Sequence, residues 1–221
     1  MLPRKLLAEF IGTAMLLAAV VGSGIMGVML SPGNAGIALL ANAAATAGVL
    51  YVLIALFGPI SGAHFNPAVT LALALRGDLR AGDALAYVLV QVAAAVAGVL
   101  LAHAMFGLPL LQPGTHARSG AAQWLSEGVA AFGLLLAILL GSRQRPQAVA
   151  GLVASYIFAA YWFTASTSFA NPAVTLARSL TQSFAGIRPS DVPGFMLAQL
   201  VGALCAVPVA RWLSPTPQAP G

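Results

Sequence analysis

Long hydrophobic stretches divide the chain into six blocks, and few polar side chains interrupt them. Each block is long enough to supply the ~20 apolar residues that an α-helix needs to cross a bilayer. The pattern therefore predicts six transmembrane helices, at residues 6–30, 37–57, 83–106, 121–141, 147–165 and 191–213.

Composition points to the same solvent. Of 221 residues, 60% are hydrophobic and only 7% are charged, whereas an ordinary soluble domain has about 25% charged residues. Ten Lys and Arg with five Asp and Glu cannot cover the surface of a water-soluble protein of this size. The net charge of +5 does not indicate a nucleic-acid partner, because the basic residues stand in pairs between apolar blocks. We expect an all-α membrane protein.

Basic residues predict the orientation, since cytoplasmic loops collect Lys and Arg. A cytoplasmic amino terminus places seven of them inside and three outside. We therefore expect a multi-pass protein of the inner (plasma) membrane with both termini in the cytoplasm. The inside group is Arg4, Lys5, Arg76, Arg80, Arg143, Arg145 and Arg211, and the outside group is Arg118, Arg178 and Arg188.

A seven-residue motif occurs twice in the chain. Asn-Pro-Ala-Val-Thr-Leu-Ala begins at Asn66 and again, unchanged, at Asn171, which is 105 residues later. Each copy lies in a moderately apolar segment, 58–82 or 166–190, between the second and third helix of its half. Because three crossings is an odd number, the second half enters the membrane from the opposite face, as in the inverted repeats of transport proteins. Two further pairs recur with similar offsets, Glu9 with Glu127 and Gln91 with Gln199.

The repeat divides the chain into a first repeat at 1–106, an extracellular connecting loop at 107–120, a second, inverted repeat at 121–213, and a Pro-rich tail at 214–221 that we expect to be disordered.

Each copy of the motif predicts a short helix that starts inside the membrane. Proline suits the first turn because its missing N–H has no partner there, and the preceding asparagine can cap the helix. Two re-entrant half-helices of about two to three turns would meet Asn to Asn at the midplane. Their N-termini, each equivalent to roughly +0.5 charge, would repel cations, while the asparagine amides donate to a neutral solute. The expected pore motifs are Asn66, Pro67, Ala68 and Asn171, Pro172, Ala173.

At these residues the sequence closely resembles the major intrinsic protein family, the aquaporins and glycerol facilitators. The resemblance rests on segments 8–13 and 61–70, the second Asn-Pro-Ala and the Glu and Gln pairs, and it covers the chain to about residue 213. It implies an aquaporin-like right-handed bundle of six helices plus two half-helices, in a homotetramer with one pore per protomer. It also implies passive flux of small neutral solutes, with Glu9 and Glu127 supporting the re-entrant loops and His64 lining the pore.

The resemblance further implies a narrower selectivity filter of four residues. Spacing from the two motif asparagines assigns them to Thr46, Ala159, Ser168 and Val174. Val174 stands where the family has an arginine, and the set contains no aromatic residue, so we expect a wide and weakly polar filter. Arg178, one turn beyond Val174, is expected in the outer vestibule.

Bacterial relatives with an apolar residue at the arginine position resemble channels associated with arsenical resistance. The expected solutes are therefore metalloid hydroxides such as arsenite, with methylated arsenicals, glycerol and some water.

A second class of function stays open. Inverted repeats also build ion- or proton-coupled secondary transporters, and Glu9 and Glu127 are the ionisable residues that such a carrier could use. An enzyme is not expected, because five acids, one cysteine and three histidines show no nucleophile–base pair and no metal-ligand spacing. We expect no cofactor and no metal, and the only expected partners are lipid, solute and further copies of the chain.

Overall fold

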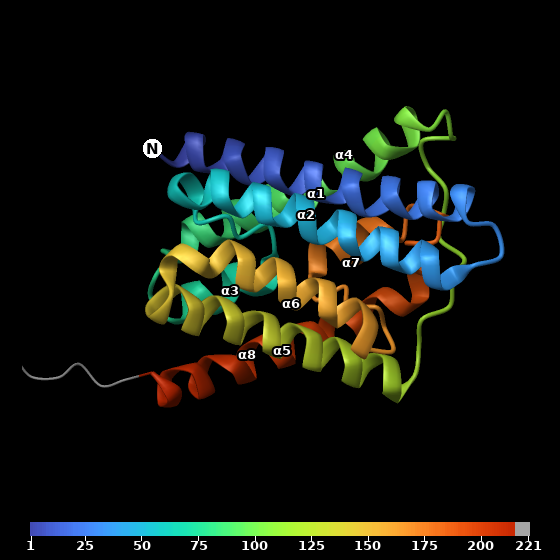
Figure 1. Cartoon of the computed structure of the whole chain (residues 1–221). Helices are drawn as coiled ribbons and strands as arrows, with labels where there is room; N and C mark the ends of the chain where they lie inside the picture. The colour runs from blue at the N-terminus through green and yellow to red at the C-terminus, as the bar shows by residue number, and fades with distance from the viewer. Residues whose placement is uncertain (215–221) are drawn as a thin grey trace, which may run out of the picture.

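A computed structural model of the chain describes residues 1–214, and all regular secondary structure in this part is helical (Figure 1). Of the expected disordered tail, residues 215–221 lie outside the described residues. The helices are α1 (Leu2–Leu30), α2 (Ala35–Ser61), α3 (Pro67–Leu75), α4 (Ala81–Met105), α5 (Ala121–Gln144), α6 (Val149–Phe163), α7 (Pro172–Arg178) and α8 (Val192–Leu213), with 3-10 turns η1 (Pro146–Ala148) and η2 (Pro189–Asp191).

Within residues 1–214, five segments are long and apolar enough to cross a membrane: α1, α2, α4, α5, and α8 together with η2. The sixth predicted span, 147–165, is shorter than expected, because α6 has only 15 residues. Pro146 starts a 3-10 turn before it, and at Thr164 the backbone becomes extended to begin the re-entrant segment. α6 and η1 together still cover most of the predicted range.

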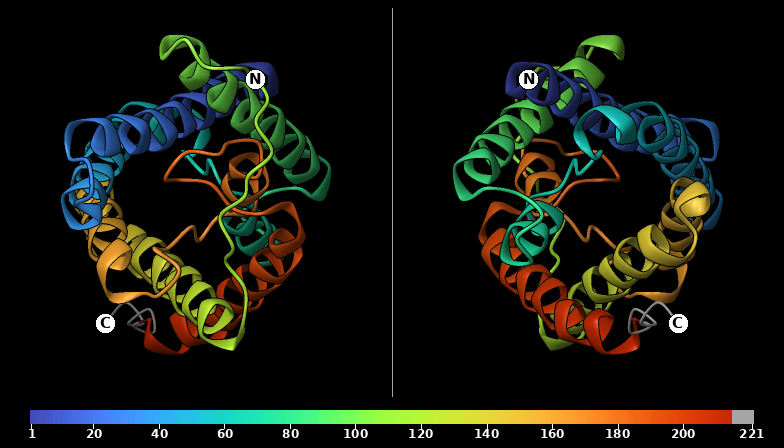
Figure 2. Two further views of the ribbon diagram at one scale, coloured as in Figure 1. Left: turned by 90° about the vertical axis from the view of Figure 1, so that its right-hand side faces the viewer. Right: turned by 90° about the vertical axis from the view of Figure 1, so that its left-hand side faces the viewer.

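The two halves repeat one order of elements, long, long, short, long. α1 packs against α2 and α4, and α5 packs in the same way against α6 and α8. Contacts between α2 and α6 join the halves on one side, while α3 and α7 approach each other in the interior. Figure 2 shows the long helices as a ring around the two short ones. This is the predicted inverted repeat with two half-helices.

Helices within each half cross closely at glycine. A Cβ added to Gly98 on α4 would lie 2.3 Å from the carbonyl oxygen of Ala14 on α1. In the other half, a Cβ on Gly202 of α8 would lie 2.1 Å from the carbonyl oxygen of Gly128 on α5. Neither backbone can move aside alone, so both crossings require glycine.

We expect Gly98→Ala and Gly202→Ala each to lower the melting temperature of the purified protein in detergent, since overpacking costs about 1–3 kcal/mol. Gly48→Ala on α2 is the matched control, because nothing lies within 4 Å of its added Cβ. Thermal unfolding followed by size-exclusion chromatography measures the effect. Equal melting temperatures for all three variants would contradict the prediction.

Candidate functional site

Each half-helix begins at its motif proline and is capped by its motif asparagine. The Asn66 side-chain oxygen accepts a hydrogen bond from the Ala68 N–H at 2.9 Å. The Asn171 oxygen accepts from the N–H groups of Ala173 at 3.0 Å and Val174 at 3.3 Å. These bonds satisfy backbone donors that have no partner within the helix. Local sequence therefore defines where α3 and α7 start.

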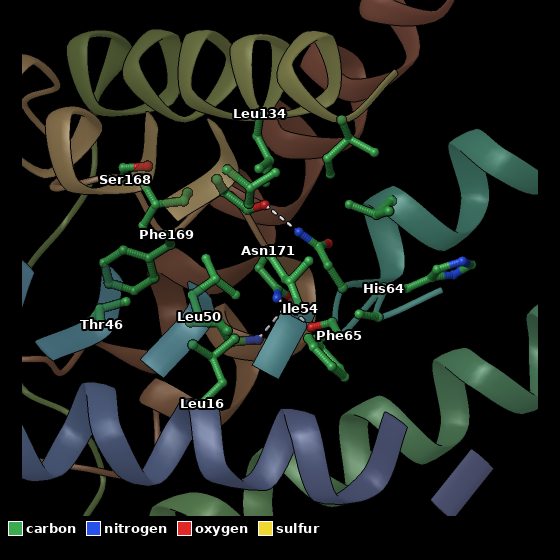
Figure 3. A pocket seen from close by; sticks show the side chains of 18 of the residues that line it. Leu16, Thr46, Leu50, Ile54, His64, Phe65, Leu134, Ser168, Phe169 and Asn171 are labelled. Atoms are coloured by element: carbon green, nitrogen blue, oxygen red, sulfur yellow. Dashed lines mark hydrogen bonds between the residues drawn. The ribbon is translucent and has the colours of Figure 1, made fainter. Parts of the chain in front are cut away.

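The two asparagines also join the two halves, which the sequence did not indicate. The Asn66 amide donates to the carbonyl oxygen of Ala170 at 2.8 Å, and the Asn171 amide donates to that of Phe65 at 2.7 Å (Figure 3). Because an amide group has two N–H bonds, each asparagine keeps one donor beyond its cross-half bond. Both side chains lie on the wall of one cavity.

The backbone just before each half-helix is strained at equivalent positions. Ala63 and Phe65 have φ angles of +49° and +48°, and Ser168 and Ala170 have +52° and +48°. Left-handed backbone in residues other than glycine costs about 1–2 kcal/mol per residue. Such strain persists only where surrounding bonds fix the conformation.

Glu9 supplies those bonds in the first half. Its fully buried carboxylate accepts from the backbone N–H groups of His64 at 2.9 Å and Phe65 at 2.7 Å. It also accepts from the Ser61 hydroxyl at 2.7 Å and the Gln91 amide at 2.9 Å. The carboxylate holds the segment before α3 and does not line the cavity.

Glu127 has the same arrangement in the second half. Its buried carboxylate accepts from the N–H groups of Phe169 and Ala170, both at 2.9 Å, and from the Gln199 amide at 2.5 Å. The recurrence of the Glu and Gln pairs in the sequence thus corresponds to two equivalent hydrogen-bond clusters, each of which holds the segment before a half-helix. Neither Gln91 nor Gln199 lines the cavity.

A cavity of about 120 Å³ lies inside the ring of helices and reaches both asparagines. Much of its wall is apolar, and Figure 3 shows Leu16, Leu50 and Leu134 around Asn171. The polar groups come mainly from the half-helices and the segments before them, together with Thr46 of α2 and Tyr161 of α6. The residues singled out from the sequence that line it are Thr46, His64, Asn66, Ser168, Asn171, Val174 and Arg178. Pro67, Ala68, Pro172 and Ala173 are buried beside it instead.

The structure corrects the expectation for Ala159. This residue is exposed on the outer side of α6, and the cavity is lined by Val153, Ile157 and Tyr161, which are four residues apart and share one helix face. The Tyr161 hydroxyl donates to the Thr46 hydroxyl at 3.2 Å. At about 100° per residue, Ala159 lies on the opposite side of α6 from Ile157 and Tyr161.

The four residues assigned to the filter include no aromatic side chain, but Phe65, Tyr161 and Phe169 line the same cavity. Hydrophobicity alone could not identify them, because aromatic residues also occur on the lipid-facing side, where Trp162 and Phe163 are exposed.

Arg178 is not in an open vestibule. Its side chain is 1% exposed, its guanidinium carbon lies 3.3 Å from the centre of the Phe169 ring, and its Nε donates to the carbonyl oxygen of Ala185. The chain after α7 folds back over it, and the Ile187 N–H donates to the Arg178 carbonyl oxygen at 3.2 Å. Arg178 is therefore a buried charge at the cavity wall beside Phe169.

Known proteins are similar to this chain in sequence and in fold. Residues 1–142 match the family described as "Major intrinsic protein". "Aquaglyceroporin AqpS" of Rhizobium meliloti is 59% identical over 212 residues, which is 96% of this chain and 91% of that protein. "Probable aquaporin AqpM" of Archaeoglobus fulgidus is 30% identical over 246 aligned residues, covering 96% of this chain and 98% of its own.

The crystal structure of the aquaglyceroporin from Plasmodium falciparum is similar, with a TM-score of 0.73 over 96% of this chain and 95% of that one. At 18% identity, this similarity concerns the fold alone. The sequence matches extend over nearly the whole chain and include both motif segments, so the chain belongs to the major intrinsic protein family.

Proposed function

We propose that the chain forms a passive channel for small neutral solutes, with the cavity between the half-helices as its pore. The observation that carries this is the meeting of Asn66 and Asn171 on the wall of one cavity, each with an amide N–H beyond its structural bonds. A water molecule or solute hydroxyl can accept from both in turn. The family comprises channels rather than enzymes, and the name of the Rhizobium relative associates it with glycerol and water.

The hydroxyl of Ser168 supports the same proposal. Ser168 is 2% exposed and lines the cavity, yet its Oγ has no hydrogen-bond partner among the described residues. A buried polar atom without a partner costs about 1–3 kcal/mol. A passing solute can satisfy it, which makes Ser168 a hydrogen-bonding station outside the asparagine pair.

The alternative of a coupled transporter finds little support. A carrier needs an ionisable group at the substrate site, and the two candidates, Glu9 and Glu127, hold the re-entrant segments and do not line the cavity. The cross-half bonds between the asparagines and the opposite backbone also favour a fixed pore over alternating access.

For the solute class, we propose arsenite and methylated arsenicals together with glycerol and some water. Val174 lines the cavity where the family's arginine is expected, and Thr46, Ser168 and Val174 are all small. Tyr161 and Phe169 make this wall more aromatic than the sequence suggested, which favours solutes that present both apolar and hydroxyl surfaces.

We also propose a homotetramer with cytoplasmic termini. Of the three basic residues assigned to the outside, Arg118 and Arg178 are buried and only Arg188 is exposed. The seven on the inside remain at least partly exposed. The charge asymmetry between the two surfaces is thus larger than the sequence count indicated, and it favours the same orientation.

Stopped-flow light scattering of proteoliposomes tests the channel directly. Vesicles containing the protein should respond faster than empty vesicles to gradients of water, glycerol and arsenous acid, with flux that does not saturate. Saturable flux driven by a pH gradient would instead indicate a carrier. Water flux without glycerol or arsenous acid flux would overturn the proposed solute class.

Val174→Arg should narrow the constriction. We expect glycerol and arsenous acid permeability to fall about tenfold while water permeability changes less than about threefold, because the long side chain restricts larger solutes first. Val174→Leu adds bulk without charge and separates the two effects. Equal permeabilities for Val174→Arg and the unmodified protein would show that position 174 does not limit passage.

A further inference from the structure

The connecting loop between the two halves crosses one end of the molecule and lies over the chain that follows α7 (Figure 2). The Gly114 N–H donates to the carbonyl oxygen of Ser179 at 2.8 Å, and the Arg188 N–H donates to that of His116 at 2.8 Å. The Arg118 N–H donates to the Asp191 carboxylate at 2.8 Å. The sequence predicted a plain extracellular connection at 107–120, but these bonds fix it in place.

The loop carries a buried guanidinium into the segment before α7. Arg118 is 6% exposed, and its Nε donates to the carbonyl oxygen of Gly186 at 2.9 Å. Its Nη1 donates to the carbonyl oxygen of Ser166 at 3.1 Å and to the Thr167 hydroxyl at 3.4 Å, and its Nη2 donates to the carbonyl oxygen of Phe184 at 3.4 Å. Arg118 thus binds one carbonyl oxygen of the segment whose N–H groups Glu127 binds, and two carbonyl oxygens of the chain that follows α7.

Two arginines contact one aromatic ring. The guanidinium carbon of Arg118 lies 5.0 Å from the centre of the Phe169 ring, and that of Arg178 lies 3.3 Å from it. Phe169 and Arg178 line the cavity, whereas Arg118 lies behind them. Guanidinium groups at this range are attracted to the ring face. Two guanidinium groups from separate parts of the chain therefore hold the Phe169 ring in place.

The Arg118 charge persists at neutral pH. Burial lowers the pKa of Arg118 to about 10, which still leaves the guanidinium protonated at pH 7. The nearby Glu127 carboxylate favours the protonated form of the Arg118 guanidinium.

We infer that Arg118 is a positioning residue that determines selectivity: it fixes the 166–169 wall of the constriction and, with Arg178, places beside Phe169 the positive charge that Val174 does not supply. The inference rests on the proposed channel function. It assigns part of the barrier against cations to the connecting loop, which lies outside both copies of the repeated motif.

Three variants separate charge from position. Arg118→Leu removes both the charge and the bonds to the Ser166 and Gly186 carbonyls. Arg118→Lys keeps the charge, but a single ammonium cannot reproduce the spread of donors of a guanidinium. Arg145→Leu is the matched control, since it removes one exposed arginine charge that makes no side-chain hydrogen bond or ion pair among the described residues and does not touch the connecting loop.

The measurements are water and glycerol permeability together with proton leak, followed with a pH-sensitive dye in the same proteoliposomes. In Arg118→Leu we expect proton leak to rise about tenfold and the glycerol-to-water permeability ratio to change about threefold, because a buried charge and a wall contact are both lost. Arg118→Lys should keep a low leak but shift the ratio. Arg145→Leu should change neither.

Wild-type leak and wild-type ratio in Arg118→Leu would overturn the inference, as would the same shifts in Arg145→Leu. Should Arg118→Leu fail to reconstitute, Arg118→Lys decides alone, and an unchanged permeability ratio in that variant contradicts the positioning role. Absence of water and glycerol flux in the unmodified protein would instead overturn the proposed channel, so the two failures are distinguishable.

Discussion

Glu127→Leu should abolish solute flux and strongly destabilise the protein. The substitution leaves the N–H groups of Phe169 and Ala170 and the amide of Gln199 without their acceptor in the interior. Each unpaired buried donor costs about 1–3 kcal/mol. The same bonds hold Ser168 and Ala170 in left-handed backbone, so their loss should release the segment that positions Asn171. Detergent melting curves and stopped-flow permeability measure the two effects.

Glu127→Gln provides the control, because a glutamine has nearly the same shape and keeps one carbonyl acceptor. We expect an intermediate loss of stability and partial flux. Glu9→Leu should reproduce the full effect in the other half, where Glu9 accepts from the N–H groups of His64 and Phe65. If Glu127→Leu melted at the same temperature as the unmodified protein and still passed solute, the Glu127 hydrogen bonds would have no energetic role.

Asn171→Asp should convert the pore from one that excludes cations into one that leaks them. The substitution places a carboxylate where two helix N-termini meet, and its charge cancels the roughly +0.5 that each terminus contributes. One carboxylate oxygen can still cap α7 by accepting from Ala173 and Val174, while the other cannot donate to the Phe65 carbonyl oxygen, so this one bond between the halves is lost. We expect proton or potassium leak to rise about tenfold or more, with water permeability retained within about threefold.

Asn34→Asp is a matched control for this experiment. Asn34 also caps a helix, accepting from the Ile37 N–H at 3.0 Å, but it lies at the exposed start of α2. The same chemical change there should alter neither leak nor water flux. If Asn171→Asp vesicles showed no added proton or potassium leak, the half-helix ends would not form the cation barrier. Ion flux assays with dye-loaded vesicles compare the two variants directly.

The sequence by itself determined the features that depend on neighbouring residues or on exact repetition. Apolar length predicted the long helices, and the Asn-Pro pair predicted where α3 and α7 start, because capping and the missing proline N–H act within a few residues. The recurrence of Glu9 as Glu127 indicated equivalent roles, and the structure places each carboxylate against the segment before its half-helix. Such local chemistry is readable without knowledge of the fold.

Tertiary structure alone decided what faces the cavity near its constriction. Ala159 and Tyr161 are two residues apart on α6, and only the rotation of that helix against α2 determines that the tyrosine faces inward. Arg118 and Arg178 are 60 residues apart, yet both contact Phe169. Their burial depends on a loop and a fold-back that pack against each other through backbone hydrogen bonds, and those bonds require no particular side chains. A sequence pattern therefore carries no signal for this packing. The sequence assigned Arg118 and Arg178 to the outer surface, whereas the structure buries both.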